Sequence, residues 1–305
     1  YTPASIEFVD IAGLVKGASK GEGLGNQFLA SIRECDAIVQ VVRCFDDENI
    51  IHVDGKVDPI RDIEVINTEL LLSDLESLTK QRVRFEKSAR AGDKEGASQL
   101  KIVDTIIEAL NNGKLAKTIQ FSDDDKKFVK SLFLITDKPV IYACNIAEAD
   151  LKKDEDSLEY VRLVKEYAKK EGSEVLVISA KVEQELTELD PADRQLFLED
   201  LGLKTSGLNR IIKLGYKLLG QISYLTAGEK EVRAWTILDG TKAPGAAGKI
   251  HSDFEKGFIK AEVVSYDDLV KYGSVANAKD AGKVRMEGKD YVVKDGDVIV
   301  FRFNV

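Results

Sequence analysis

The chain has 305 residues, 44% of them hydrophobic and 32% charged, which is the composition of an ordinary globular protein with two or three domains. No apolar run approaches the roughly 20 residues needed to span a bilayer, so we expect no membrane partner. The net charge of −9 argues against a protein that coats DNA, and we expect no sequence-specific DNA binding.

The charge is distributed unevenly along the chain. Residues 222–305 contain 13 Lys+Arg and 13 Asp+Glu, so the first 221 residues, with 31 basic and 40 acidic side chains, carry the whole deficit. This asymmetry indicates a neutral C-terminal module that is distinct from an acidic body.

The cysteines, Cys35, Cys44 and Cys144, lie within or beside apolar runs and form no CxxC pair. An odd number without metal-ligand spacing favours reduced thiols that pack in a core. It also favours a cytoplasmic protein.

The first predicted elements are a strand, a glycine-dense stretch and a helix. Residues 5–9 form a short β-type run that ends at Asp10. Residues 13–25 are rich in glycine, and residues 26–34 have a helical pattern.

Three further apolar runs predict a sheet. Residues 37–42, 139–144 and 175–178 are nearly continuous apolar runs, which are typical of strands covered on both faces. An amphipathic helix over residues 155–171 separates the last two runs. Strand, helix and strand at this spacing predict a parallel, doubly wound α/β sheet.

Residues 63–117 interrupt that alternation. Their apolar side chains recur at three- and four-residue steps in two stretches, and residues 91–93 (Ala-Gly-Asp) supply a turn between them. We therefore predict an antiparallel helical hairpin inserted into the α/β domain.

A helix over residues 208–219 closes this part of the chain, and short strands and turns follow. Residues 232–238, 258–264 and 298–303 have strand patterns, and residues 294–297 form a turn before the last strand. These features predict a small α+β domain of grasp-like fold.

The motif that begins at Asp10 (Asp-Ile-Ala-Gly) is the first with a chemical interpretation. In P-loop NTPases an aspartate at the end of this strand helps to hold Mg²⁺, and the glycine, here Gly13, meets the γ-phosphate through its amide. Magnesium prefers hard oxygen ligands and keeps several waters, so one carboxylate is sufficient. The motif alone is a weak signal, and a strand followed by a plain loop is the alternative.

The glycines that follow leave two functions open. Gly21, Gly23 and Gly25 suit a loop that closes over a γ-phosphate. They also resemble a dinucleotide-binding turn, but Asn26 stands where the third glycine of that fingerprint belongs.

Two motifs directly follow predicted strands. Residues 145–148 (Asn-Ile-Ala-Glu) follow one strand, and residues 179–181 (Ser-Ala-Lys) follow the next. Open α/β sheets bind ligands at this edge, where GTPases place an N-K-x-D motif and an S-A-K motif. Each motif alone is compatible with a helix cap or a turn, but their order together favours a nucleotide site.

With these motifs the chain resembles the YchF, or Obg-like ATPase, family over essentially its whole length. The resemblance rests on residues 10–26 (DIAGLVKGASKGEGLGN), residues 145–148, and residues 232–237 (VRAWTI) with 288–297 (GKDYVVKDGD).

The resemblance implies three domains. Residues 1–62 and 118–221 would form a Ras-like NTPase domain with a parallel sheet. Residues 63–117 would form the inserted helical hairpin, and residues 222–305 a TGS domain of ubiquitin-like grasp fold.

The resemblance also implies function. We expect an Mg²⁺-dependent, ATP-binding and ATP-hydrolysing switch protein with the ribosome as partner. The implied site residues are Asn145, Ile146, Glu148, Ser179 and Ala180 for the nucleotide, Asp10 for the metal, and Gly13, Leu14 and His52 for catalysis.

One departure from the family concerns the phosphate-binding loop. The sequence contains no G-x-x-x-x-G-K-[ST], begins at Tyr1 and has Met286 as its only methionine. We expect a fragment that lacks the N-terminal P-loop segment, binds nucleotide poorly and is itself inactive.

Glu148 predicts the choice of base. The aspartate of N-K-x-D accepts hydrogen bonds from guanine N1–H and N2–H₂, and the extra methylene of Glu148 should displace this carboxylate. Adenine has no equivalent pair of donors at that edge. We therefore expect ATP to be preferred over GTP, while Asn145 contacts the purine N7 side.

Leu14 and His52 bear on hydrolysis. Leu14 stands where Ras-type proteins carry the glutamine that orients the attacking water, and leucine cannot hydrogen-bond to water. His52 matches a histidine of the family implicated in hydrolysis, although a solvated loop histidine is an equal alternative.

The hairpin tip is basic. Lys80, Arg82, Arg84, Lys87 and Arg90 are candidates for contact with rRNA phosphates. A solvated helix face is the plainer interpretation of such a charge run. As a function from another class, we consider a nucleotide-independent RNA- or protein-binding scaffold with a degenerate NTPase domain.

Overall fold

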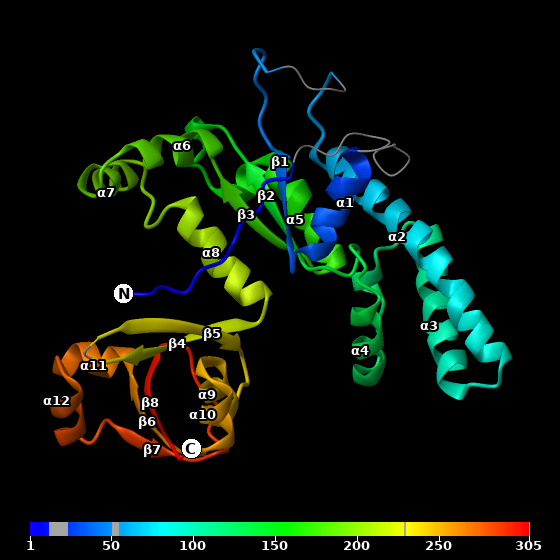
Figure 1. The fold of residues 1–305 in the computed structure, drawn as a ribbon. Coiled ribbons are helices and arrows are strands. Elements are labelled where there is room, and N and C mark those ends of the chain that lie inside the picture. The colour runs from blue at the N-terminus through cyan, green and yellow to red at the C-terminus, as the bar shows by residue number, and fades with distance from the viewer. Residues whose placement is uncertain (12–23, 51–54, 229, 305) are drawn as a thin grey trace. The chain divides into compact units, whose positions relative to one another are not determined.

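The computed structural model describes residues 1–11, 24–50, 55–228 and 230–304. Within it the chain divides into two compact units, one of residues 9–211 and one of residues 1–8 with 212–305 (Figure 1). The predictions for Gly13, Leu14 and His52 fall outside the described residues.

The first unit contains a parallel sheet, as the apolar runs predicted. Strands β1 (Ile38–Arg43), β2 (Val140–Asn145) and β3 (Glu174–Ile178) lie in the order β1-β2-β3, and both pairs are parallel. Residues 140–144 of the central strand are all buried, which is why this strand has no alternation of polar and apolar residues.

Helix α5 (Glu159–Glu171) forms the crossover between β2 and β3. Its apolar side chains at Val161, Val164 and Ala168 share one face and pack against Tyr142 of the sheet. The helix begins four residues later than predicted, because residues 155–157 form a separate 3₁₀ turn.

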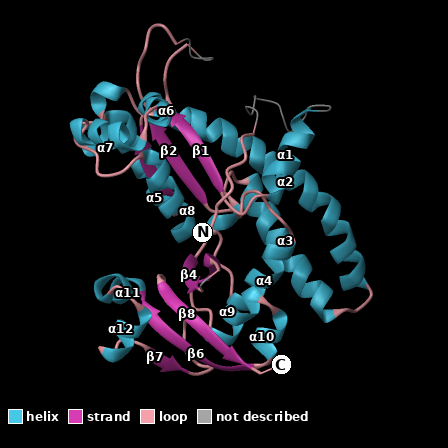
Figure 2. Ribbon diagram, turned by 60° about the vertical axis from the view of Figure 1, so that its left-hand side comes forward, coloured by secondary structure: helices cyan, strands magenta, loops and turns pink. Residues whose placement is uncertain are grey.

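The predicted helical hairpin is confirmed. Helices α2 (Pro59–Arg90) and α3 (Lys94–Asn111) lie side by side in both views (Figures 1 and 2). The turn between them contains Gly92 at φ 85°, a left-handed conformation that glycine adopts without steric cost. Asp93 then caps α3 by accepting a hydrogen bond from the Glu95 N–H.

Helix α4 (Asp123–Ser131) also packs on the hairpin, which the sequence did not predict. Its Phe128 ring meets the Phe85 ring of α2 edge to face, with centroids 5.4 Å apart.

The predicted strand over residues 5–9 is wrong. This segment has no strand conformation, and its side chains at Phe8 and Val9 are 46% and 53% exposed. A strand requires a neighbour for its backbone groups. Within the second unit it is Thr2 that pairs with the edge of β5 (Val232–Leu238), through the Thr2 N–H to Val232 O and the Ala234 N–H to Thr2 O.

The second unit is built on a five-stranded mixed sheet in the order β5-β4-β8-β6-β7. The predicted strands correspond to β5, β6 (Phe258–Ser265) and β8 (Asp297–Phe303). The sequence did not predict the remaining elements, which are β4 (Gln221–Ala227), β7 (Arg285–Glu287), α9 (Ala243–Ile250), α10 (Ser252–Lys256), α11 (Tyr266–Tyr272) and α12 (Val275–Asp280).

The other α-helices of the first unit among the described residues are α1 (Leu24–Glu34), α6 (Ala180–Glu188) and α7 (Pro191–Asp200), and α8 (Gly207–Leu218) spans the boundary between the units. Helix α8 carries the chain from the first unit into the second. The predicted three-domain boundaries at residues 62, 117 and 221 stay predictions. None of the described helices is long and apolar enough to cross a membrane.

The cysteines pack as predicted. Cys44 and Cys144 are buried in the core cluster that packs on the parallel sheet, and Cys35 is half-buried. All three are free thiols. A hydrogen bond to Cys144 and burial raise the pKa of the Cys44 thiol well above its usual range, which disfavours the thiolate form.

Candidate functional site

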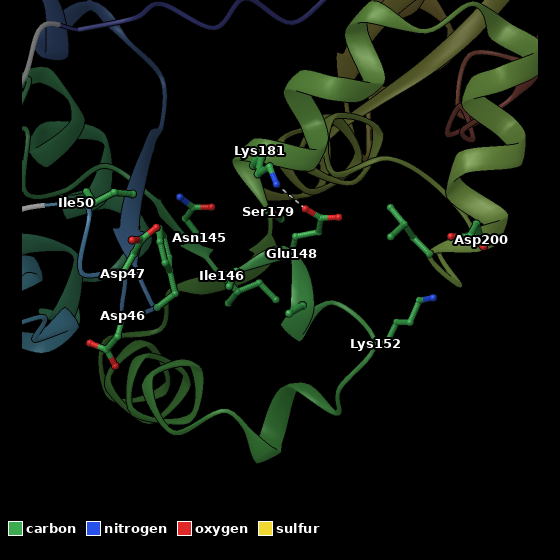
Figure 3. Close-up of a pocket in the computed structure, with 14 residues that line it drawn as sticks. Asp46, Asp47, Ile50, Asn145, Ile146, Glu148, Lys152, Ser179, Lys181 and Asp200 are labelled. Atoms are coloured by element: carbon green, nitrogen blue, oxygen red, sulfur yellow. Dashed lines mark hydrogen bonds and ion pairs between the residues drawn. The ribbon is translucent and has the colours of Figure 1, made fainter.

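A pocket of about 690 Å³ opens at the carboxyl ends of the parallel strands (Figure 3). The strand register aligns Arg43, Asn145 and Ile178, so the segments that follow β1, β2 and β3 leave the sheet together. All three segments and the end of α7 line the pocket: Phe45, Asp46, Asp47, Ile50, Asn145, Ile146, Ala147, Glu148, Ala149, Lys152, Ser179, Lys181, Asp200 and Leu201.

Asn145 has a defined orientation in this pocket. Its Oδ1 accepts a hydrogen bond of 2.9 Å from the Ala180 N–H, the first residue of α6. This contact joins the segment after β2 to the segment after β3. It leaves the Asn145 Nδ2 as a donor with no hydrogen bond to any described residue.

Ser179 is buried with an unsatisfied hydroxyl. Its side chain lines the pocket, the residue is 2% exposed, and its Oγ has no hydrogen-bond partner in the described part of the chain. A buried hydroxyl without a partner costs about 1–3 kcal/mol, so such groups in a pocket are commonly satisfied by a ligand or by water.

Glu148 is held by an ion pair. It begins the short 3₁₀ turn Glu148–Asp150, and its Oε2 lies 2.8 Å from the Lys181 Nζ (Figure 3). The hydrogen bond that Lys181 donates to Glu148, together with the charges of Glu148 and then Glu185, raises the pKa of Lys181. The carboxylate is therefore engaged within the protein.

Arg43, at the end of β1, orders the opposite wall. Its guanidinium donates to three backbone carbonyls, those of Phe45 (3.0 Å), Ile50 (3.0 Å) and Asp47 (3.2 Å), and stacks over the Phe45 ring. The loop of residues 45–50 is thus tied to the sheet.

Comparisons with known proteins decide the family. The first 73 residues match a family model described as "50S ribosome-binding GTPase", and residues 221–304 match the C-terminal model YchF-GTPase_C, described as "Protein of unknown function (DUF933)". The chain is 54% identical over 303 residues to "Ribosome-binding ATPase YchF" of Bacillus subtilis (strain 168), covering 99% of the chain and 82% of that protein. The YchF of Escherichia coli O157:H7 is 52% identical with the same coverage. The chain belongs to the YchF family.

A solved structure supports the fold. The Schizosaccharomyces pombe YchF GTPase superposes with a TM-score of 0.81 at 39% identity, over 96% of this chain and 79% of that one. The predicted resemblance and the predicted fold class are therefore confirmed: a parallel α/β NTPase domain with an inserted helical hairpin and a C-terminal α+β domain.

The structure brings together most of the nucleotide-binding residues predicted from the YchF resemblance. Asn145, Ile146, Glu148 and Ser179 line the pocket, and Ala180 contacts it through the bond to Asn145. Their role in binding stays a prediction. Sequence reasoning missed Arg43 and the loop it orders, because no motif marks an arginine at a strand end.

The predicted metal ligand of this YchF chain, Asp10, lies outside the pocket lining. It is an exposed residue, and the neighbouring Ile11 packs against Leu29, Ile32 and Leu70. Among the described residues no group of three or more His, Cys, Asp or Glu could hold a metal. A single exposed carboxylate fits Mg²⁺, which keeps several water ligands.

The hairpin charges are not equivalent. Lys80 pairs with Glu76 at 2.6 Å, Arg82 with Asp104 at 2.6 Å, and Arg90 with Glu86 at 2.5 Å. By contrast, Arg84 and Lys87 are exposed and form no ion pair with any residue in the described ranges. These two side chains are the basic groups most available to a partner.

Proposed function

We propose that the full-length protein is a P-loop ATPase that binds the ribosome and acts in the cytoplasm as a nucleotide-dependent switch. The observation that carries this proposal is the pocket at the strand ends. There the Asn145 Nδ2 and the buried Ser179 hydroxyl have no hydrogen-bond partner among the described residues, so both can bind a polar ligand. The names of the relatives, ribosome-binding ATPases, support the same reaction and partner.

The charge of the pocket supports the proposal that it takes the base of the nucleotide. Four carboxylates line it (Asp46, Asp47, Glu148 and Asp200) against two ammonium groups (Lys152 and Lys181). An excess of negative charge disfavours a triphosphate and tolerates a neutral purine. The phosphates would therefore lie outside this pocket.

Asp10 is the proposed ligand for Mg²⁺, which when bound neutralises charge that develops on the β- and γ-phosphate oxygens. We assign Gly13 to the γ-phosphate through its amide. Leu14 cannot orient water, so another polar group must do so, and His52 is our candidate. His52 follows Ile50, the last residue of the loop that Arg43 orders, by two positions in the sequence.

His52→Ala in the full-length protein should lower kcat for ATP by roughly 100-fold and leave the ATP Kd nearly unchanged. A group that acts mainly in the transition state contributes to turnover and little to ground-state binding. Steady-state hydrolysis and an ATP titration on the same preparations test this. An unchanged kcat would show that His52 has no role in hydrolysis.

For the ribosome, neutralising Arg84 and Lys87 together by glutamine should weaken binding and reduce the slope of log K against log salt by about 2, since each phosphate contact contributes about 1. The fold should be unaffected, because both side chains are exposed and unpaired within the described chain. Co-sedimentation with ribosomes across a salt series measures both quantities.

Lys80→Gln is the matched control for this experiment. Lys80 lies on the same helix but already pairs with Glu76, so its loss should change the slope less than the loss of Lys87 alone. If the double variant sediments with ribosomes like wild type at every salt concentration, the contact lies elsewhere on the protein.

A further inference from the structure

The ion pair between Lys181 and Glu148 lies inside the proposed base pocket (Figure 3). We propose that Lys181 is a specificity-determining residue, which holds the Glu148 carboxylate away from the base and so disfavours guanine. This inference rests on the proposed function, because it concerns the same ATP site.

The length of Glu148 is an incomplete barrier to guanine. A glutamate has rotatable bonds with which it can fold back, so its carboxylate could still accept from guanine N1–H and N2–H₂. The Lys181 Nζ, 2.8 Å from Oε2, restricts this freedom. To meet guanine, the carboxylate would have to give up a charge-assisted hydrogen bond.

A second group at the same edge is also engaged. The Ala180 N–H, which lies between Ser179 and Lys181 in the chain, donates to Asn145 Oδ1 at 2.9 Å. This donor is therefore not free for guanine O6. Adenine presents an N6–H₂ donor and an N1 acceptor instead, and a serine hydroxyl can serve as partner to either.

The size of the effect follows from exposure. The side chains of Lys181 and Glu148 are 70% and 40% exposed, so solvent and salt screen their attraction. We expect the pair to contribute a factor of about 2–5 to discrimination against GTP, with Glu148 itself contributing the larger part. The factor should decrease as salt increases.

The test is a comparison of ATP and GTP affinities in the full-length protein, with non-hydrolysable analogues and Mg²⁺. Lys181→Met keeps the length of the side chain and removes its charge. We expect the GTP Kd to fall about 2–5-fold while the ATP Kd stays within about twofold. Lys181→Arg, which keeps the charge, should retain the wild-type ratio of GTP Kd to ATP Kd.

Lys152→Met is the matched control. Lys152 lines the same pocket but forms no ion pair with a residue of the described chain, so its loss removes an equal charge without freeing a carboxylate. It should change both affinities by the same factor. In a Glu148→Gln background, Lys181→Met should no longer change the ratio.

The outcomes separate the inference from the function on which it rests. Wild-type protein that binds neither ATP nor GTP would overturn the proposed function. If Lys181→Met binds ATP normally and its ratio of GTP Kd to ATP Kd equals that of the wild type, the inference alone is overturned. The same ratio shift in Lys152→Met, or a shift that persists with Glu148→Gln, would also overturn it, because pocket charge and not the ion pair would then be the cause.

Discussion

Replacing Asp74 with alanine is expected to lower the free energy of unfolding of the NTPase-like unit by about 3–5 kcal/mol, the usual loss when one partner of a buried ion pair is removed. Asp74 is 0% exposed. Its carboxylate accepts hydrogen bonds from Arg33 Nη1 (3.0 Å), the Ile135 N–H (3.1 Å), the Thr136 N–H (2.8 Å) and Thr136 Oγ1 (2.7 Å).

The loss is large because the donors of Ile135 and Thr136 stay buried when the carboxylate is gone. The Arg33 guanidinium also donates to Ser73 and to Phe133 O, so it cannot turn to solvent without breaking further contacts. Asp74 thereby ties α1 and α2 to the segment that leads into the central strand β2. Without Asp74, donors in two segments, Arg33 of α1 and residues 135–136, would lose their common acceptor.

Urea unfolding followed by circular dichroism measures this effect. Asp74→Asn, which keeps the volume but replaces one acceptor oxygen with a donor, should also be destabilised. Glu76→Ala, on the same helix and in an exposed pair with Lys80, should leave the urea midpoint unchanged. An Asp74→Ala midpoint equal to that of Glu76→Ala would contradict our account of this carboxylate.

The full-length protein is expected to bind ATP about 100-fold more tightly than GTP, because a paired contact to guanine worth roughly 2–3 kcal/mol is lost. The aspartate of an N-K-x-D motif would make this contact. Here Glu148 is one methylene longer, and its carboxylate is engaged by Lys181 at 2.8 Å. Adenine requires no such acceptor.

Titration with both nucleotides in the presence of Mg²⁺ decides this prediction. Glu148→Asp introduces the shorter side chain of the N-K-x-D motif. It should strengthen GTP binding and so reduce the preference for ATP over GTP. Equal or tighter binding of GTP by the wild-type protein would refute the assignment of Glu148 as the residue that excludes guanine.

The elements that the sequence determined are those specified by local pattern. The buried strands β1, β2 and β3 are visible as apolar runs, and the hairpin as helical periodicity interrupted at residues 91–93. The placement of Asn145 and Ser179 at one edge also followed from sequence, because parallel strands joined by a crossover helix end on the same side of their sheet.

Tertiary structure alone decided the features that depend on partners distant in the chain. The β-type run at residues 5–9 has no neighbouring strand among the described residues, so its local propensity did not make it a strand. Arg82 belongs to the basic run at the hairpin tip, yet it is paired with Asp104, which lies 22 residues away on the facing helix. Long charged side chains have many rotamers, and only the packed neighbours select the partner.

The same reason applies to the site. The motifs indicated which residues follow the strands. They did not indicate that the buried Ser179 hydroxyl has no partner among the residues that the structure describes, or that Lys181 pairs with Glu148. Both facts depend on the angle at which α6 leaves β3 and on the turn that follows β2. These geometries are set by packing between elements, which no single segment of sequence specifies.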